Sequence, residues 1–391
     1  MSIEGTNEAP ASQRIRYGMV GGGEGAFIGA VHRIAARLDD RYVLVAGALS
    51  SEAERSRRSG VALGLAPERC YGSFEEMAQK EASRADGIEA VVIVTPNHLH
   101  VPVAQVFLEA GIHVICDKPL AANLQETVGL QELASAKGCL FAVTYNYSGY
   151  PLIRHAREMV SQGELGALRV IQVEYPQDWL SEKLEDTGQK QAEWRTDPAR
   201  AGGGGCLGDI GTHAFHLACF VSGLTPQSVL ADLTSFVEGR LLDDNVHVLL
   251  RFAEGAKGML WASQVAPGNE NALRLRVYGE KGGVEWSQEN PNVLKWSPLG
   301  EPPRLLTRGG PGLTNAAERL TRIPPGHPEG YLEGFANLYT EVAEALVAQR
   351  NGTGPSASVM FPGLEEGIAG MRFVDAVLRS SQAGGVWTSL E

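Results

Sequence analysis

The chain has 391 residues, of which 43 % are hydrophobic and 20 % charged, a composition that predicts folding throughout rather than intrinsic disorder. Its formal net charge of −12 argues against nucleic acid as a partner, because nucleic-acid binders concentrate lysine and arginine on one face. The length exceeds one ordinary core, so we expect two domains, residues 15–150 and 151–391, after a polar leader over residues 1–14.

The cysteines and the hydropathy pattern narrow the class of protein. Five cysteines are an odd number and none are spaced as Cys-x-x-Cys, so neither a disulfide framework nor a zinc site is predicted. No apolar run reaches the roughly 20 residues that cross a bilayer, and the first dozen residues are polar. We expect a cytoplasmic protein with reduced thiols, no metal, no membrane contact and a neutral small-molecule substrate.

The first part of the chain alternates between strand and helix patterns. Strands are predicted at 16–20, 42–49, 90–94, 112–116 and 139–145. Helices are predicted at 26–38, 52–63, 74–80, 102–110 and 123–137. Continuous β-branched runs such as 90–94 suit strands buried on both faces, so the pattern predicts an α/β domain with a doubly wound parallel sheet.

After residue 150 the pattern changes to consecutive strands. These are predicted at 168–175, 228–236, 245–252, 257–264 and 273–278, with turns at 253–255 and 280–283. Strands without intervening helices indicate a largely antiparallel sheet, hence an α+β domain. The helices predicted to cover one face of this sheet are 154–161, 211–220, 331–348 and 363–379. Residues 298–329 are rich in proline and glycine and are predicted to form an irregular segment without helices or strands.

A glycine cluster follows the first strand and precedes the first helix. Gly21, Gly23 and Ala26 fit the pattern G-x-G-x-x-[GA] in the context that the dinucleotide fingerprint requires. Glycine there lets backbone N–H groups approach a pyrophosphate at a helix N-terminus. The cofactor-binding residues predicted in this loop are Gly21, Gly23, Gly25, Ala26, Phe27 and Ile28.

The end of the second strand bears on the choice between NAD and NADP. An acidic residue commonly binds the adenosine ribose of NAD here, but the sequence has Ser50 and Ser51, with Arg55 one helical turn on. Hydroxyls and an arginine suit a 2′-phosphate and favour NADP. Alternatively Ser50 caps the next helix and Arg55 is a solvated surface charge, so both cofactors stay open.

Two further segments lie at carboxyl ends of predicted parallel strands, where doubly wound folds bind ligands. The first holds Thr95, Pro96 and Asn97, with His100 close behind, and the second holds Asp117 and Lys118 before a proline. All six are predicted to contact the cofactor. A lysine in such a loop faces the cleft, although a solvated surface lysine is the alternative.

A run of glycines at 202–205 introduces a helix whose first turn carries Asp209 and His213. Four residues apart, these side chains share one face of a helix. A carboxylate beside an imidazole raises the pKa of the imidazole and makes a base that works near neutral pH. Alternatively, Asp209 is an N-cap and His213 a partly buried histidine.

Together these segments resemble the family of glucose–fructose oxidoreductase, inositol dehydrogenase and the rhizopine-catabolism dehydrogenases, known as Gfo/Idh/MocA. The markers, spread over nearly the whole chain, are the glycine loop, Thr95–Asn97 with His100, 109–114, Asp117–Pro119, Trp194-Arg195, the glycine run and Asp209 with His213. The resemblance implies an NAD(P)-dependent oxidoreductase that transfers a hydride to or from a secondary hydroxyl or ketone of a sugar, cyclitol or glycoside.

The resemblance also implies roles for individual residues. Lys118, Asp209 and His213 look like the catalytic set: Lys118 polarises the substrate oxygen and His213 takes or returns the proton. Trp194 and Arg195 resemble a pair at the domain junction that contacts the cofactor. The substrate-binding residues expected are Lys118, Tyr145, Tyr147, Arg195, Asp209 and His213.

This sequence departs from the family pattern twice. Asp117 stands where the family usually has glutamate, and three extra residues separate Gly23 from Gly29 and His32 if these match the family's Gly-x-x-His.

Two other functions stay open. An NAD-dependent glycosidase, which oxidises its substrate transiently, needs an extra base, for which Tyr145, Tyr147 and His216 are candidates. A non-catalytic sensor is expected to lose the lysine or the histidine, and both are present. A homodimer or homotetramer is the expected assembly.

Overall fold

The computed structural model describes residues 14–391, so the predicted leader, residues 1–14, lies outside the described residues except for Arg14. Among the described residues no helix has both the length and the apolar character needed to cross a membrane.

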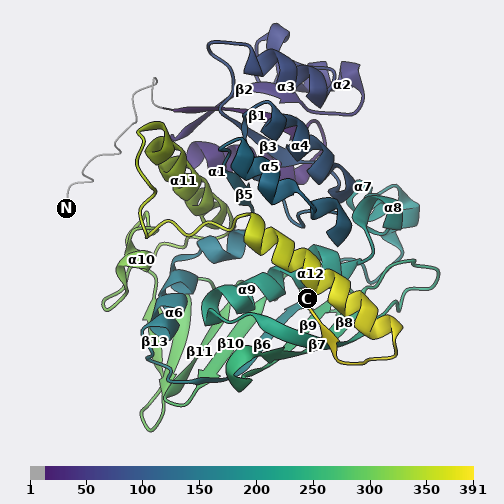
Figure 1. Cartoon of the computed structure of the whole chain (residues 1–391). Coiled ribbons are helices and arrows are strands. Elements are labelled where there is room, and N and C mark those ends of the chain that lie inside the picture. The colour runs from purple at the N-terminus through teal and green to yellow at the C-terminus, as the bar shows by residue number, and fades with distance from the viewer. Residues whose placement is uncertain (1–13) are drawn as a thin grey trace.

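The first sheet is the parallel, doubly wound sheet that the sequence predicts (Figure 1). Its strand order is β2-β1-β3-β4-β5 and all neighbours are parallel. The strands are β1 (Ile15–Gly21), β2 (Tyr42–Ala48), β3 (Ala90–Val94), β4 (His113–Cys116) and β5 (Phe141–Val143). The helices between them are α1 (Phe27–Leu38), α2 (Ala53–Ala62), α3 (Phe74–Ala82), α4 (His100–Glu109) and α5 (Leu130–Ala136). Every residue of β3 is buried, as a strand covered on both faces requires.

The helix predicted over residues 123–137 is wrong in its first half. A 3-10 helix at Leu124–Thr127 is followed by Gly129 in the left-handed conformation with φ +80°, and α5 begins only at Leu130. Glycine adopts this conformation without the clash that a Cβ atom causes, so one residue interrupts the helix.

The second sheet is largely antiparallel, as predicted, and has the strand order β13-β12-β11-β10-β6-β9-β8-β7-β14. The strands are β6 (Leu168–Pro176), β7 (Pro226–Thr234), β8 (Asn245–Phe252), β9 (Lys257–Ser263), β10 (Arg274–Gly279), β11 (Gly282–Ser287), β12 (Val293–Pro298), β13 (Arg304–Thr307) and β14 (Thr388–Ser389). The pair β6 and β9 is parallel and lies at the centre of the sheet. This pair is therefore joined by a long crossover over residues 177–256, which includes the strands β7 and β8.

The prediction for the edge of this sheet was incomplete. Residues 298–329, predicted as irregular, contain β13 and the short helix α10 (Asn315–Glu318), and the strands β11, β12 and β14 were missed as well. Elements of two to six residues at a sheet edge have too few positions for a periodic pattern to stand out.

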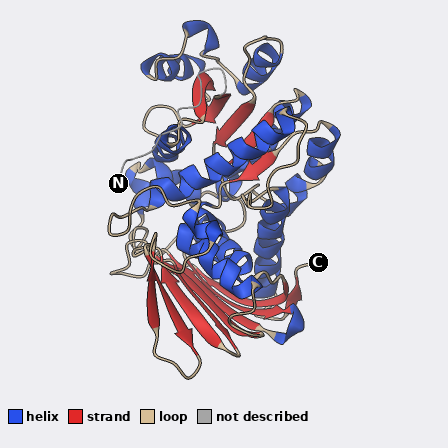
Figure 2. Ribbon diagram, turned by 90° about the vertical axis from the view of Figure 1, so that its left-hand side faces the viewer, coloured by secondary structure: helices blue, strands red, loops and turns tan. Residues whose placement is uncertain are grey.

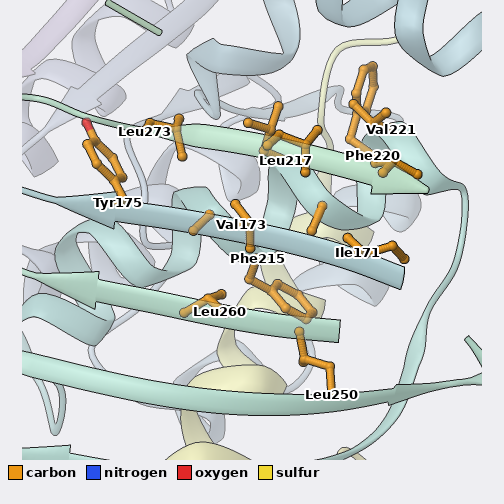
Figure 3. Close-up of a cluster of buried hydrophobic side chains, with 14 of the residues drawn as sticks. Ile171, Val173, Tyr175, Phe215, Leu217, Phe220, Val221, Leu250, Leu260 and Leu273 are labelled. Carbon is orange, nitrogen blue, oxygen red and sulfur yellow. The ribbon is translucent and has the colours of Figure 1, made fainter. Parts of the chain in front are cut away.

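One face of the second sheet is covered by α6 (Pro151–Ser161), α9 (Thr212–Ser222) and α12 (Leu364–Gln382). Figure 3 shows Ile171 and Val173 of β6 beside Phe215 and Leu217 of α9 in this core. Figure 2 shows the helices on one side of the sheet only, and no described helix covers the other face.

The helix α11 (Tyr331–Arg350) does not cover the second sheet, so that prediction is wrong. It packs on α1, and its residues Phe335 and Tyr339 share a buried cluster with Ile15 and Tyr17 of the first sheet. The Tyr42 hydroxyl donates to the backbone oxygen of Tyr339 at 2.9 Å. The helix α11, from the last part of the chain, thus completes the hydrophobic core of the first sheet. The division of the chain into two domains at residue 150 stays a prediction.

Two short helices missed by the prediction connect the halves of the molecule. They are α7 (Lys190–Arg195) and α8 (Pro198–Ala201), which lie beside the first sheet in Figure 1. The Asn97 amide donates to the backbone oxygen of Ala201 at 2.9 Å. A segment of the second half is thereby fixed over the carboxyl ends of the parallel strands.

Candidate active site

A cleft of about 590 Å³ lies between the carboxyl ends of the parallel strands and the segment of α7 and α8. This is the position at which doubly wound sheets bind ligands. The predicted site residues that line it are Gly21, Gly23, Ala26, Ile28, Ser50, Ser51, Arg55, Thr95, Pro96, Asn97, Asp117, Lys118, Trp194, Arg195 and Asp209. Outside this lining are three predicted cofactor residues, Gly25, Phe27 and His100, and three predicted catalytic or substrate-binding residues, Tyr145, Tyr147 and His213.

The glycine turn has the shape that a dinucleotide needs. Gly21 and Gly22 have φ of +79° and +71°, and a Cβ on Gly29 would lie 2.4 Å from the Cα of Gly22. Gly29 therefore makes a close contact between helix and turn of the kind that the third small residue of the motif makes in dinucleotide-binding folds. The N-terminus of α1 has no side-chain cap, so its N–H groups are free to bind a phosphate. These features fit a dinucleotide pyrophosphate.

The end of β2 presents hydroxyls and one cation to the cleft. The Ser50 hydroxyl accepts from the Glu52 N–H at 3.2 Å, but α2 begins at Ala53 with Glu52 as its N-cap and has no side-chain cap hydrogen bond, so the capping interpretation of Ser50 is wrong. The Arg55 guanidinium donates to the backbone oxygen of Glu24 at 2.9 Å and makes no ion pair among residues 14–391. Arg55 is thus a cation that faces the cleft.

The loop with Lys118 is fixed by buried polar contacts. The Asp117 carboxylate accepts from the Lys118 N–H and from the Thr144 hydroxyl, each at 2.9 Å. The two ring nitrogens of His100 lie 2.7 Å from the Pro119 oxygen and 2.9 Å from the Thr95 oxygen. His100 therefore ties the two strand-end loops together from behind the cleft.

Lys118 and Asp209 meet although 91 positions separate them in the sequence. The Lys118 Nζ donates to Asp209 Oδ1 at 2.9 Å. At the other carboxylate oxygen, the Arg195 Nε lies 3.2 Å away and the Gln264 amide donates at 2.9 Å. Burial by itself raises the pKa of Asp209, but Arg195 and Lys118 outweigh it and hold this pKa far below its ordinary value. Asp209 is therefore an anion held by three side chains.

His213 lies on α9 one turn beyond Asp209, which is in a π-helical turn (Leu207–Gly211). Its ring centre is 4.8 Å from that of Tyr147 and 5.9 Å from that of Tyr145. The expected rise in the pKa of His213 is wrong: burial, followed by the charge of Lys118, lowers it well below the usual value and outweighs Asp209. His213 is therefore neutral near pH 7 and able to accept a proton.

The three candidates for an additional base have different surroundings. Tyr145 stacks on His216 with ring centres 4.3 Å apart, and both side chains are buried. Burial lowers the pKa of His216 to about 3 and raises the pKa of Tyr145. The Tyr147 hydroxyl is hydrogen-bonded to the hydroxyl of Tyr175. Tyr145 and His216 thus pack against each other, and of the two tyrosine rings that of Tyr147 lies closer to His213.

Some cleft residues were missed by the sequence reasoning. Lys190 and Gln191 line the cleft from α7, and Arg200 lines it from α8. Lys190 and Gln191 lie four positions before Trp194 and Arg195, so helical spacing could have found them. Gln264 has no local signal, because only the fold brings the end of β9 to Asp209.

Comparison with known proteins identifies the family. Residues 15–145 match the oxidoreductase family with an NAD-binding Rossmann fold, and residues 153–285 match the Gfo/Idh/MocA C-terminal domain. The chain belongs to this family and is an NAD-binding oxidoreductase, as the sequence predicted.

Individual relatives resemble the chain over almost its whole length. The uncharacterized oxidoreductase YfiI of Bacillus subtilis is 37 % identical, with coverage of 97 % of this chain and 98 % of that one. An oxidoreductase structure from Sinorhizobium meliloti is 56 % identical, with a TM-score of 0.88 and coverage of 96 % and 99 %. An inositol dehydrogenase homologue from Azotobacter vinelandii, solved with NAD⁺, is 38 % identical, with a TM-score of 0.95 and coverage of 99 % and 100 %. Its structure with NADH and myo-inositol is 37 % identical, with a TM-score of 0.90 and coverage of 97 % and 98 %.

Proposed function

We propose that this protein is a dehydrogenase or reductase that transfers a hydride between a nicotinamide cofactor and a secondary hydroxyl or ketone of a sugar or cyclitol. The observation that carries the proposal is the convergence of Lys118, Asp209 and His213 next to a cleft with a dinucleotide-type glycine turn. The Azotobacter vinelandii homologue, solved with NADH and myo-inositol, supports the substrate class.

The chain's own groups would divide the chemistry as follows. The Lys118 ammonium stabilises negative charge on the substrate oxygen, and the neutral His213 ring accepts the hydroxyl proton during oxidation. Asp209 holds the ammonium in place and stays ionised. A bound nicotinamide supplies the hydride acceptor or donor, and the turn at Gly21 together with Thr95–Asn97 would hold the dinucleotide.

The glycosidase alternative needs one more base at the substrate. Tyr145 and His216, two of its three candidates, are buried and stacked on each other, and none of the three candidates lines the cleft. No observation at the site favours that alternative over direct oxidation or reduction, and its product is easily measured in the same experiment.

The test is turnover with NAD⁺ and NADP⁺ against a panel of sugars, cyclitols and aryl glycosides, recording nicotinamide absorbance and aglycone release together. We expect net nicotinamide reduction, and a kcat/KM lower by about 10²–10³-fold in Lys118→Met, because an electrostatic stabiliser of the reacting oxygen is lost. Lys137→Met is the matched control, since Lys137 contacts the Glu109 oxygen at an exposed position. Equal turnover of the two variants would contradict the proposal, as would aglycone release without reduction.

A further inference from the structure

One end of the second sheet carries a row of side-chain amides. Four adjacent strands, in the order β11, β10, β6, β9, bring Gln288, Asn271, Gln177 and Gln264 to this end. The register explains the alignment: Arg274 at the start of β10 pairs with Glu174 near the end of β6 and with Ser287 at the end of β11, while β6 and β9 run parallel. We call these four residues the amide row.

Hydrogen bonds connect three members of the amide row to one another. The Asn271 amide N–H donates to Gln288 Oε1 at 3.1 Å, and the Gln177 amide N–H donates to Asn271 Oδ1 at 2.7 Å. The Trp179 indole donates to Gln177 Oε1 at 3.1 Å. A carboxamide offers two N–H donors and two oxygen lone pairs, so each member keeps capacity for another partner.

The amide row reaches the catalytic residues at two points. Gln264 donates to the Asp209 carboxylate at 2.9 Å. The Tyr175 hydroxyl donates to Asn271 Oδ1 at 2.7 Å, and the Tyr175 ring centre is 6.3 Å from that of His213. Gln177, Trp179 and Asn271 are partly exposed, whereas Gln264 is buried. Gln264 of the row thus contacts Asp209 directly, and Asn271 connects through Tyr175 to the ring of His213.

The row is neutral, and the cations next to it are already paired. Lys118 and Arg195 both contact the Asp209 carboxylate. A phosphate or carboxylate on the substrate would compete with Asp209 for these cations and would be desolvated beside a fixed anion. Hydroxyl groups, by contrast, both donate and accept, as amides do.

We propose that the amide row is the subsite that binds the non-reacting hydroxyls of an uncharged polyhydroxylated ring, and that it selects such rings over their phosphorylated or carboxylated counterparts. This inference rests on the proposed function, because it takes Lys118 and His213 as the reacting end. It assigns substrate binding to Gln177 and Asn271, two partly exposed residues outside the catalytic set, and leaves the buried Gln264 as a positioning residue for Asp209.

The test measures binding as well as turnover. Titration calorimetry on the protein saturated with NAD⁺ uses myo-inositol, D-glucose and D-xylose, beside myo-inositol 1-phosphate, glucose 6-phosphate and glucuronate. The variants are Gln177→Met and Asn271→Ser, which shorten or remove one amide. The control is Gln227→Met, at an exposed position on β7 of the same sheet.

We expect a neutral ring to bind at least about tenfold more tightly than its charged counterpart. Each amide variant should weaken the binding of the neutral ring about tenfold, because one or two hydrogen bonds contribute about that much binding free energy. In turnover the variants should raise KM for the ring with little change in kcat or in KM for NAD⁺, because the contacts are remote from the reacting carbon. Tighter binding of a charged ring, no binding of any neutral ring, or amide variants equal to Gln227→Met would overturn the inference. Ring binding that depends on the amide row without any hydride transfer would instead leave the inference standing and refute the proposed function.

Discussion

At the scale of single residues, the site depends on groups whose charge is set by burial. Asp209 remains an anion because Lys118, Arg195 and Gln264 hold its two oxygens. No hydrogen bond joins Asp209 to His213 among the described residues, so the carboxylate positions the lysine rather than the histidine. The Nδ1 atom of His213 is buried without a hydrogen-bond partner among residues 14–391, and the neutral ring is the form that this environment favours.

The pH dependence of oxidation follows from the lowered pKa of His213. A base acts in its neutral form, which exists above its pKa, so lowering the pKa extends the active range toward acid. We expect kcat/KM for the polyol to show no loss near pH 6.5, the ordinary histidine value, between about pH 8 and about pH 6. Initial rates of NAD⁺ reduction across this range check the prediction.

The variant His213→Asn serves as the comparison for that profile. It should lower kcat by about 10²–10⁴-fold, as expected when a general base is removed. A fall in the wild-type rate centred near pH 6.5, absent in His213→Asn, would show that the histidine titrates normally and would contradict the environment derived from its burial.

At the scale of elements, the turn between β1 and α1 contains the glycine motif and lines the cleft proposed to bind the cofactor. The contact of Gly29 with Gly22 lets α1 begin close to the turn, with its free N–H groups directed at the cleft.

We expect Gly29→Ala to weaken NAD⁺ binding by at least about tenfold. The added Cβ would lie 2.4 Å from the Gly22 Cα and 2.5 Å from the Gly22 oxygen, and backbone atoms cannot move aside without displacing the turn. Fluorescence titration of NAD⁺ measures the effect, after thermal unfolding has verified a folded protein. Gly354→Ala is the control, since its Cβ would meet no atom within 4 Å. A Kd equal to that of this control would disprove the role of Gly29.

At the scale of the whole molecule, the second sheet has one face packed by helices and one face without a described helix on it (Figure 2). Leu249 of β8 and Met259 of β9 are direct neighbours on that open face, 44 % and 47 % exposed, and Val170 of β6 is 39 % exposed. Exposed apolar side chains clustered on a sheet favour association. A second copy of this chain, joined face to face, is the expected partner.

The corresponding experiment is Met259→Arg, followed by light scattering after size-exclusion chromatography. We expect the wild type to be a dimer or tetramer and the variant to shift toward the monomer, because a charge would be desolvated in the interface. Val61→Arg, at a 56 % exposed position on α2, is the control and should keep the wild-type assembly. A monomeric wild type, or an unchanged assembly of the Met259 variant, would be evidence against the open face as the interface.

Local patterns in the sequence were enough for the parallel sheet, the glycine turn, the loop with Lys118 and the change to antiparallel strands after residue 150. Each depends on residues within a few positions of one another, and for these the chain carries a periodic or motif signal. The family followed from the same segments. The error in the helix over 123–137 also has a local cause, because one glycine interrupted an otherwise helical pattern.

Only the tertiary structure decided how distant residues meet. The ion pair of Lys118 with Asp209, the packing of α11 on the first sheet, the alignment of the amide row and the lowered pKa of His213 all depend on contacts between positions far apart in the chain and on exclusion of water. Burial and neighbouring charge are properties of the folded environment, and no short stretch of sequence contains them.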